Sequence, residues 1–168
     1  MTTLDDKLGA LRRTLSEMES VLVAFSGGVD SSFLLWVAAE TLGPNCTALT
    51  TVSMAVPEDD QTTARRLAAR LGIRHLVIPT DEIALSDYAR NPTNRCYFCK
   101  NNLFQICARQ AQGLGIQVVA DGANVDDLGD HRPGLQAAAD AGVRPVSYTH
   151  LRAHETNDLI AYAVFCLK

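Results

Sequence analysis

An apolar run that leads into a glycine turn constrains the fold more than any other part of the chain. Five apolar residues at 21–25 are followed within two positions by the adjacent glycines Gly27 and Gly28. A continuous apolar run that ends at glycine is typical of a strand buried on both faces of a sheet. Residues 31–42 then have the apolar pattern of a helix, which a Gly-Pro pair closes. Strand, glycine turn and helix in this order predict the first unit of a parallel sheet.

The same alternation continues along the chain. Leucines at spacings of three and four predict an amphipathic helix that precedes the first strand and ends near Ser20. Strands that alternate with helices imply parallel pairing, right-handed crossovers and helices on both faces of the sheet. We therefore predict an α/β fold, a three-layer α/β/α sandwich with a parallel sheet. Further strands are expected at 46–52, 75–78 and 116–120, and further helices at 57–71, 97–112 (capped by Gly113) and 133–141.

The composition suits one soluble globular domain. The 168 residues are 47% hydrophobic and 20% charged, which is enough apolar material for a core. The formal net charge of −4 disfavours binding to a nucleic-acid backbone. No apolar run approaches the roughly 20 residues that cross a bilayer, and the N-terminus does not resemble a signal peptide. Five cysteines, an odd number, suit thiols in a reducing compartment, so we expect a cytoplasmic protein without membrane association.

The turn after the first strand is where a ligand is expected, because ligands bind beyond the carboxyl ends of parallel strands. Adjacent glycines let the backbone approach a phosphate closely, and the following helix offers unpaired amides and the positive end of its dipole. The turn lacks the lysine of a Walker A loop and the G-x-G-x-x-G pattern of dinucleotide-binding folds. Taken alone, a Gly-Gly pair is equally compatible with a turn whose glycines serve geometry only.

The full turn, Ser-Gly-Gly-Val-Asp-Ser at 26–31, resembles the pyrophosphate loop of the PP-loop ATP pyrophosphatases. Four further segments resemble the LarE-type ATP-dependent sacrificial sulfur transferases of that superfamily. The resemblance implies an adenine nucleotide alpha hydrolase-like fold and an enzyme that adenylates a carboxylate of a pyridinium mononucleotide, releases pyrophosphate and transfers sulfur toward a nickel-pincer cofactor. The segments are Asn-Arg-Cys-Tyr-Phe-Cys-Lys at 94–100, Asp-Gly-Ala-Asn at 121–124, Asp-Asp at 126–127 and His-Arg-Pro-Gly-Leu at 131–135.

The resemblance also implies ATP and Mg²⁺ as ligands, with Asp30 and Ser31 acting in catalysis. Asp121 and Asp127 are expected to hold Mg²⁺, and Arg132 to pair with phosphate or the substrate carboxylate. From the residues alone, a solvated acidic loop around Asp126 and Asp127, a surface arginine and a turn serine at Ser53 are the plain alternatives. Nucleotide contacts are expected from Ala24, Ser26, Gly27, Gly28, Asp30, Ser31, Ser53, Asp121 and Gly122.

Cys96 and Cys99 form a C-x-x-C pair at the expected start of a helix, where the helix dipole and basic neighbours such as Lys100 favour thiolates. Such a pair suits zinc, an iron–sulfur cluster or a redox pair, and two packing cysteines are the plain alternative. The resemblance implies an iron–sulfur cluster and a catalytic role, with a third cysteine from further along the chain. Cys46 and Cys107 are expected to be small core residues.

The resemblance covers about residues 4–144, so we expect a PP-loop domain at 1–144 without the family's C-terminal substrate domain. Residues 145–168 resemble a peptide encoded by synthetic adaptor sequence, and we predict a non-native tail. His150 and His154 have a metal-binding spacing, but no site is expected in such a tail. Two other functions stay open: thiolation of tRNA, and nucleotide binding without turnover. The sequence also leaves association into a homo-oligomer open.

Overall fold

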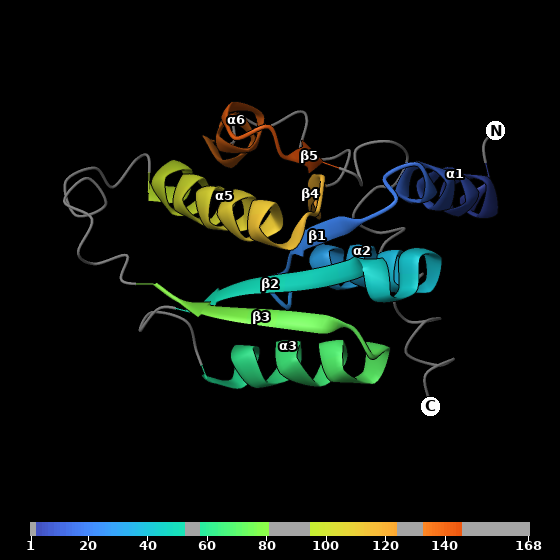
Figure 1. The fold of residues 1–168 in the computed structure, drawn as a ribbon, viewed down its shortest axis with the longest axis horizontal. Helices are drawn as coiled ribbons and strands as arrows, with labels where there is room; N and C mark the ends of the chain where they lie inside the picture. Colours follow the sequence, from blue (N-terminus) through green and yellow to red (C-terminus); the bar gives the residue numbers. More distant parts are fainter. Residues whose placement is uncertain (1–2, 53–57, 81–94, 124–132, 146–168) are drawn as a thin grey trace.

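Five parallel strands form one sheet in the order β3-β2-β1-β4-β5 (Figure 1). The computed structural model describes residues 3–52, 58–80, 95–123 and 133–145. β1 is the central strand and pairs with β2 on one side and with β4 on the other. The strands are β1 (Val21–Ala24), β2 (Cys46–Val52), β3 (Arg74–Pro79), β4 (Val118–Asp121) and β5 (Arg144–Pro145).

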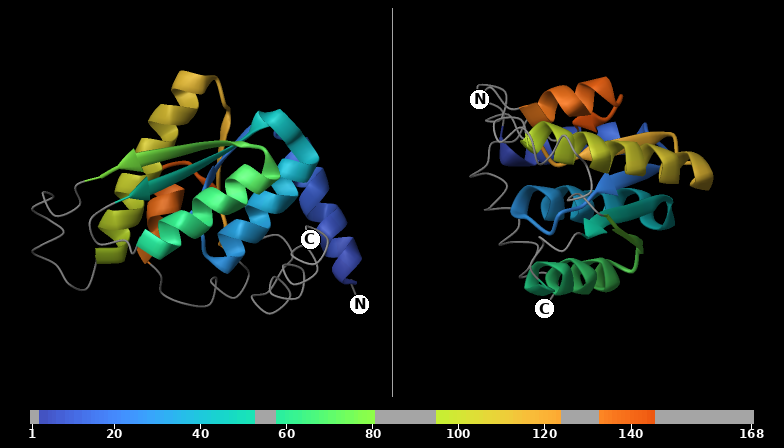
Figure 2. Two further views of the ribbon diagram at one scale, coloured as in Figure 1. Left: turned by 90° about the horizontal axis from the view of Figure 1, so that it is seen from below. Right: turned by 90° about the vertical axis from the view of Figure 1, so that its left-hand side faces the viewer.

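Helices cover both faces of the sheet, which confirms the predicted three-layer α/β/α sandwich. In Figures 1 and 2, α2 and α3 lie on one face and α5 and α6 on the other, while α1 packs beside α2. Within the described ranges, no helix combines the length and apolar character that a membrane crossing requires. The helices are α1 (Leu4–Ser16), α2 (Val29–Leu42), α3 (Glu58–Leu71), α5 (Arg95–Leu114) and α6 (Pro133–Asp140), with a 3₁₀ turn η1 at Gly43–Asn45.

β1 is buried on both faces, which explains its unbroken apolar sequence. Val21 and Val23 belong to the core cluster formed with α1, α2 and α3, as does Phe25 just beyond the strand. Leu22 and Ala24 belong to the cluster formed with α5 and α6. Alternate residues of a strand point to opposite faces, so this one strand contributes to both cores. The turn that follows β1 is therefore held by the most buried part of the sheet.

α1 ends earlier than the apolar spacing predicts. Its last residue is Ser16, and the expected end near Ser20 lies instead in a turn where Glu19 has a positive φ of 59°. Met18 lies in that turn and is only 5% exposed. Its place in the apolar pattern therefore reflects burial against the core and does not reflect helical structure.

The end of α5 and the last strand also differ from the prediction. α5 continues through Gly113, the expected cap, to Leu114, and Gly115 follows with a φ of 70°. A glycine with this left-handed backbone is the one that stops a helix. β5 was not predicted, because two residues carry no periodicity. It pairs with β4 and extends the sheet to Pro145, one residue beyond the expected boundary at 144.

His75 is a partly buried side chain near the start of β3. Its Nε2 lies 2.8 Å from the Thr50 hydroxyl oxygen. Its ring meets the Phe25 ring nearly edge-on, with 5.8 Å between the ring centroids. Burial lowers the pKa of His75 below its ordinary value of 6.5, and the positive charge of Arg65 on α3 lowers it further.

Acid is therefore expected to weaken the fold through His75. The unfolded chain binds a proton near pH 6.5, before the native imidazole does, so the free energy of unfolding falls as the pH drops below that value. The loss is complete once the pH lies below the lowered native pKa. Urea unfolding between about pH 5 and 7.5 measures this slope. His75→Gln should flatten it, and an unchanged slope would contradict the assignment to His75.

Candidate functional site

The chain leaves β1 and β4 toward opposite edges of the sheet. From β1 it continues to β2 and β3, and from β4 to β5, which produces the order β3-β2-β1-β4-β5. In open α/β sheets such a reversal forms a crevice outside the carboxyl ends of the two strands, and ligands bind there. The glycine turn follows β1 at this edge, and Asp121 and Gly122 lie at the end of β4. The fold therefore brings the two predicted nucleotide-binding segments together.

The turn after β1 is held by its own hydroxyl groups. Gly27 has a φ of 83°, a conformation that favours glycine, and Gly28 is the N-cap residue of α2, which begins earlier than predicted. The Ser26 hydroxyl accepts a hydrogen bond from the Gly28 amide at 3.3 Å and lies 3.1 Å from the Ser31 hydroxyl. The Ser31 hydroxyl donates to the Gly28 carbonyl at 3.1 Å. This network keeps the short turn in one shape.

The backbone is the main source of donors for an anion at this turn. No side-chain hydrogen bond caps α2 at Gly28, and the first amides of a helix have no partners within the helix. The helix dipole adds positive potential at the same point. The hydroxyls of Ser31 and Ser32 donate to carbonyl groups of the turn itself. Asp30 lies in the first turn of α2 and adds a carboxylate there.

Gly122 brings the end of β4 into direct contact with the start of α2. A Cβ atom at this position would lie 2.8 Å from both the Cα and the amide nitrogen of Ser31 and 3.0 Å from the carbonyl carbon of Asp30. All three are backbone atoms, which cannot swing aside as a flexible side chain can. Only glycine therefore fits at this crossing of β4 and the glycine turn.

Lys100 contacts the end of β4, whereas the sequence analysis named it only as a basic neighbour of the cysteine pair. Its ammonium donates to Oδ2 of Asp121 at 2.9 Å, while Oδ1 of that carboxylate accepts from the Gly122 amide at 2.9 Å. The side chain of Asp121 is 10% exposed and that of Lys100 is 41% exposed. The ammonium also lies 5.6 Å from the centroid of the Phe104 ring. Among the described residues, this ion pair lies beside the glycine turn. The only sequence signal was the place of this lysine directly after Cys99.

The two core cysteines are confirmed as buried residues. Cys46 and Cys107 are both 0% exposed. The pKa of each thiol is raised to about 12, at Cys46 by burial and at Cys107 by burial together with the nearby Asp121 carboxylate. Cys99 on α5 is partly buried. The backbone of Cys96 opens α5, but its side chain lies outside the described part of the structure.

The difference in burial between Cys99 and the two core cysteines predicts selective alkylation of the folded protein. At about pH 8, a thiol of pKa about 12 is ionised in roughly one molecule in ten thousand, so Cys46 and Cys107 should not react with iodoacetamide. Cys99 should react. Mass spectrometry of the peptides from native and urea-unfolded protein measures the labelling. Modification of Cys46 or Cys107 at the rate of Cys99 in the native state would contradict the burial.

Of the other predicted site residues, Ala24 is the one that lies in the described part of the chain. Ala24 is buried in β1 at 4% exposure, so any contact with a ligand would come from its backbone. Across ranges 3–52, 58–80, 95–123 and 133–145, no group of three or more histidine, cysteine, aspartate or glutamate residues is arranged to hold a metal ion. The candidate site residues outside the described ranges are Ser53, Asn124, Asp126, Asp127 and Arg132. The predicted tail at 146–168 also lies outside them.

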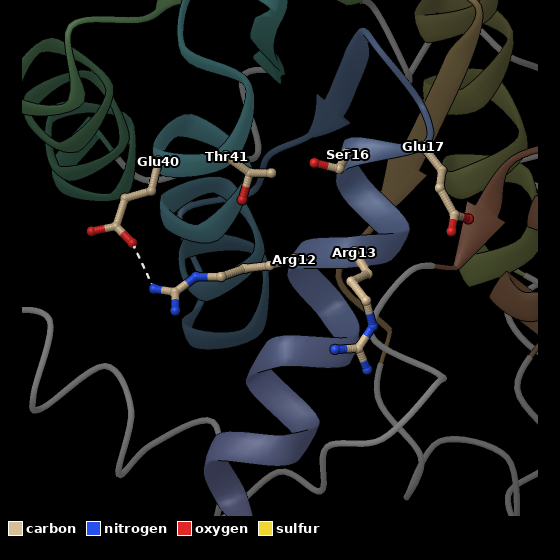
Figure 3. Close-up of a pocket in the computed structure, with 6 residues that line it drawn as sticks. All are labelled: Arg12, Arg13, Ser16, Glu17, Glu40 and Thr41. Atoms are coloured by element: carbon tan, nitrogen blue, oxygen red, sulfur yellow. Dashed lines mark hydrogen bonds and ion pairs between the residues drawn. The ribbon is translucent and has the colours of Figure 1, made fainter.

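A second concave surface lies near the amino ends of the strands, whereas the glycine turn lies at their carboxyl ends. An open groove of about 760 Å³ runs between the C-terminal halves of α1 and α2 (Figure 3). Arg12 and Glu40 form an ion pair of 3.0 Å across it, and both side chains are exposed. Both helices end beside the amino ends of the strands that follow them, so this groove is separate from the glycine turn. Its lining consists of Arg12, Arg13, Ser16, Glu17, Glu40 and Thr41.

Solved structures define the class to which this fold and site belong. The NMN synthetase of Francisella tularensis superposes with a TM-score of 0.75 at 19% identity, over 95% of this chain and 70% of that one. The tRNA thiolase NcsA of Methanococcus maripaludis, solved with its 4Fe-4S cluster, has a TM-score of 0.68 at 17% identity, over 98% and 66%. The parallel sheet with its glycine turn is thus an adenine nucleotide alpha hydrolase-like fold of the PP-loop type.

Sequence comparisons then identify the family. The model described as asparagine synthase matches residues 5–95, more than half of the chain, and the chain belongs to this family. It is 43% identical over 141 residues to an uncharacterised protein of Synechocystis, covering 84% of this chain and 53% of that protein. It is 32% identical over 145 residues to the pyridinium-3,5-bisthiocarboxylic acid mononucleotide synthase of Lactiplantibacillus plantarum, covering 86% and 52%. The LarE-type resemblance is confirmed, and the chain spans about half the length of these relatives.

Proposed function

We propose that this chain is the ATP-binding domain of an enzyme that adenylates a carboxylate of a pyridinium mononucleotide for sulfur transfer. The observation that carries the proposal is the contact of Gly122 with the glycine turn, which puts an anion-binding helix start and the Asp121 carboxylate in one crevice. The similarity to the mononucleotide synthase supports this choice of substrate class. The net charge of −4 suits a small-molecule substrate better than a nucleic-acid backbone.

The glycine turn suits the phosphates of ATP. The first backbone amides of α2, directly after the glycine turn, would hold the oxygens of the departing pyrophosphate, with the α2 dipole favouring their charge. An oxygen of the substrate carboxylate attacks the α-phosphorus, and the bond from that phosphorus to the bridging oxygen of pyrophosphate breaks. The products are an acyl adenylate and pyrophosphate. The chain's own contribution is positioning and charge stabilisation.

We propose that Mg²⁺ binds at the end of β4 through the remaining lone pairs of the Asp121 carboxylate, whose two oxygens already accept from Lys100 and from the Gly122 amide. Asp121 supplies carboxylate oxygens, which are the ligands this ion prefers, and the expected second ligand, Asp127, lies outside the described ranges. When bound, the ion neutralises phosphate charge. Asp30 would act beside it in the first turn of α2, and Lys100 supplies a fixed positive charge at the same edge.

The sulfur-transfer step is assigned to Cys96 and Cys99 at the start of α5. These two residues would ligate an iron–sulfur cluster, and Arg132 would pair with the carboxylate of the substrate. Ser53 is proposed to lie near the adenine or ribose. α5 also carries Lys100, which links the cysteine pair to the crevice through the ion pair with Asp121.

Pyrophosphate release tests the proposed reaction. The purified chain is incubated with ATP, Mg²⁺ and nicotinic acid mononucleotide as the carboxylate acceptor, and pyrophosphate and AMP are quantified. We expect acceptor-dependent release that Asp30→Ala abolishes. ATP-dependent thermal stabilisation without any pyrophosphate would reduce the function to nucleotide binding. Salt-dependent binding of tRNA, with release that depends on tRNA and not on the mononucleotide, would favour tRNA thiolation.

Iron–sulfur binding needs a separate measurement. Anaerobic reconstitution with iron and sulfide should produce the visible absorption of a cluster in the native chain and lose it in both Cys96→Ala and Cys99→Ala. Cys107→Ala is the matched control, because Cys107 is buried away from solvent and should leave the spectrum unchanged. Identical spectra for all four proteins would remove the cluster from the proposal.

A further inference from the structure

A chain of polar contacts crosses three strands beneath the glycine turn. The hydroxyl of Thr50 on β2 donates to the Phe25 carbonyl at 2.7 Å, just beyond the end of β1. The same hydroxyl oxygen lies 2.8 Å from Nε2 of His75 on β3. Thr50 is 7% exposed and Phe25 is 2% exposed, so water competes little for these contacts. We call His75, Thr50 and the Phe25 carbonyl the relay.

The single hydroxyl proton of Thr50 decides which group is the donor in each hydrogen bond of the relay. A carbonyl oxygen can only accept, so the single proton of the Thr50 hydroxyl is used at Phe25. The hydroxyl oxygen must then accept from His75, which requires a proton on Nε2. His75 is therefore the donor at the start of the relay. An imidazole with its proton on Nδ1 alone would leave two acceptors facing each other.

The relay ends at the peptide group that leads into the glycine turn. The Phe25 amide donates to the Leu49 carbonyl at 2.8 Å, so β2 holds Phe25 through both its amide and its carbonyl. The His75 ring also contacts the Phe25 ring edge-on. Ser26 is the next residue, and its hydroxyl bonds the Gly28 amide. The orientation of one peptide plane therefore sets where the turn begins.

We propose that His75 is a positioning residue for the glycine turn. By donating to Thr50 it fixes the Phe25 carbonyl, and so it keeps the glycine turn and the first amides of α2 in the arrangement that receives a phosphate. His75 lies on β3, two strands from β1 in the sheet, and acts only through Thr50. The inference rests on the proposed function for the identity of the ligand, which is the triphosphate of ATP.

Paired substitutions at the two relay side chains test this role. Thr50→Val keeps the shape of the side chain but removes the hydroxyl, and His75→Phe keeps a ring beside Phe25 but removes the donor. Thr50→Ser retains the hydroxyl, and His75→Gln retains an N–H near the position of Nε2. Thr47→Val is the matched control, because Thr47 is a buried threonine of the same strand outside the relay.

ATP affinity from titration calorimetry and the amide resonances of Gly27 and Gly28 are the two readouts. Thr50→Val is expected to weaken ATP binding about tenfold, and His75→Phe somewhat less, because one buried hydrogen bond is lost. Thr50→Ser, His75→Gln and Thr47→Val should stay within about twofold of the native chain. In the ligand-free protein, the Gly27 and Gly28 amides should shift only in Thr50→Val and His75→Phe. Melting curves verify that every variant is folded at the temperature of the titration.

The two readouts separate this inference from the proposed function. If the native chain binds ATP but Thr50→Val and His75→Phe bind it equally well with unmoved Gly27 and Gly28 amides, His75 has no positioning role. If the native chain binds no ATP, the proposed function fails. The amide shifts of the ligand-free variants then still decide whether the relay positions the turn. Equal shifts in Thr47→Val would also overturn the inference, since they would show a general response of β2.

Discussion

Gly122→Ala is expected to remove ATP binding and to destabilise the folded chain. The new Cβ would lie 2.8 Å from backbone atoms of Ser31 and 3.0 Å from the backbone of Asp30. Either β4 or the start of α2 must move, and both carry proposed phosphate or metal contacts. Such overpacking costs about 1–3 kcal/mol, and a displaced turn should weaken ATP binding at least about tenfold. Urea unfolding and titration calorimetry measure the two effects.

Gly113→Ala is the matched control for that experiment. Gly113 lies within α5, has no positive φ, and a Cβ added there would meet no atom within 4 Å. Alanine is a better helix former than glycine, so this variant should gain about 0.5–1 kcal/mol and bind ATP normally. Equal behaviour of Gly122→Ala and Gly113→Ala would show that the end of β4 does not press on the glycine turn.

Local patterns in the sequence account for most of the fold. The apolar run before the glycine turn predicts a strand buried on both faces, and β1 has that position in the centre of the sheet. β2 matches its predicted range of 46–52 because β-branched threonine and valine residues favour a strand, and the Gly-Pro pair at 43–44 marks its start. The end of α1 could not be predicted, because Met18 continues the helical spacing while its backbone has left the helix.

The site was predictable only where one segment forms it. The glycine turn is contiguous, so its motif is visible in the sequence, and the structure adds its internal hydrogen bonds. The pair of Lys100 and Asp121 joins α5 to β4, and no periodicity relates two positions on different elements. The need for glycine at 122 likewise comes from α2, which is distant in the sequence. Contacts between elements, and not residue types, were the missing information.

Lys100→Met is expected to impair both stability and turnover. The Asp121 carboxylate is 10% exposed, and without the ammonium the bond from the Gly122 amide is what remains to it among the described residues. Leaving a largely buried carboxylate without its partner should lower the free energy of unfolding by about 1–3 kcal/mol. Loss of a fixed positive charge beside the phosphates should slow pyrophosphate release about a hundredfold. Lys100→Arg should retain most of the stability, because its guanidinium can still donate to the carboxylate.

The double variant Lys100→Met, Asp121→Asn separates these two effects. The neutral amide of asparagine needs no cation, so the double variant should be more stable than Lys100→Met alone. Turnover should stay low, because neither the ammonium nor the carboxylate is restored. If the double variant regained both stability and pyrophosphate release, Lys100 would act only by balancing the charge of Asp121. If stability alone recovers, Asp121→Asn, which keeps the ammonium, assigns the remaining loss of rate. A lower rate in the double variant than in Asp121→Asn makes Lys100 part of the machinery that stabilises the phosphates, and equal rates assign the loss to the missing carboxylate.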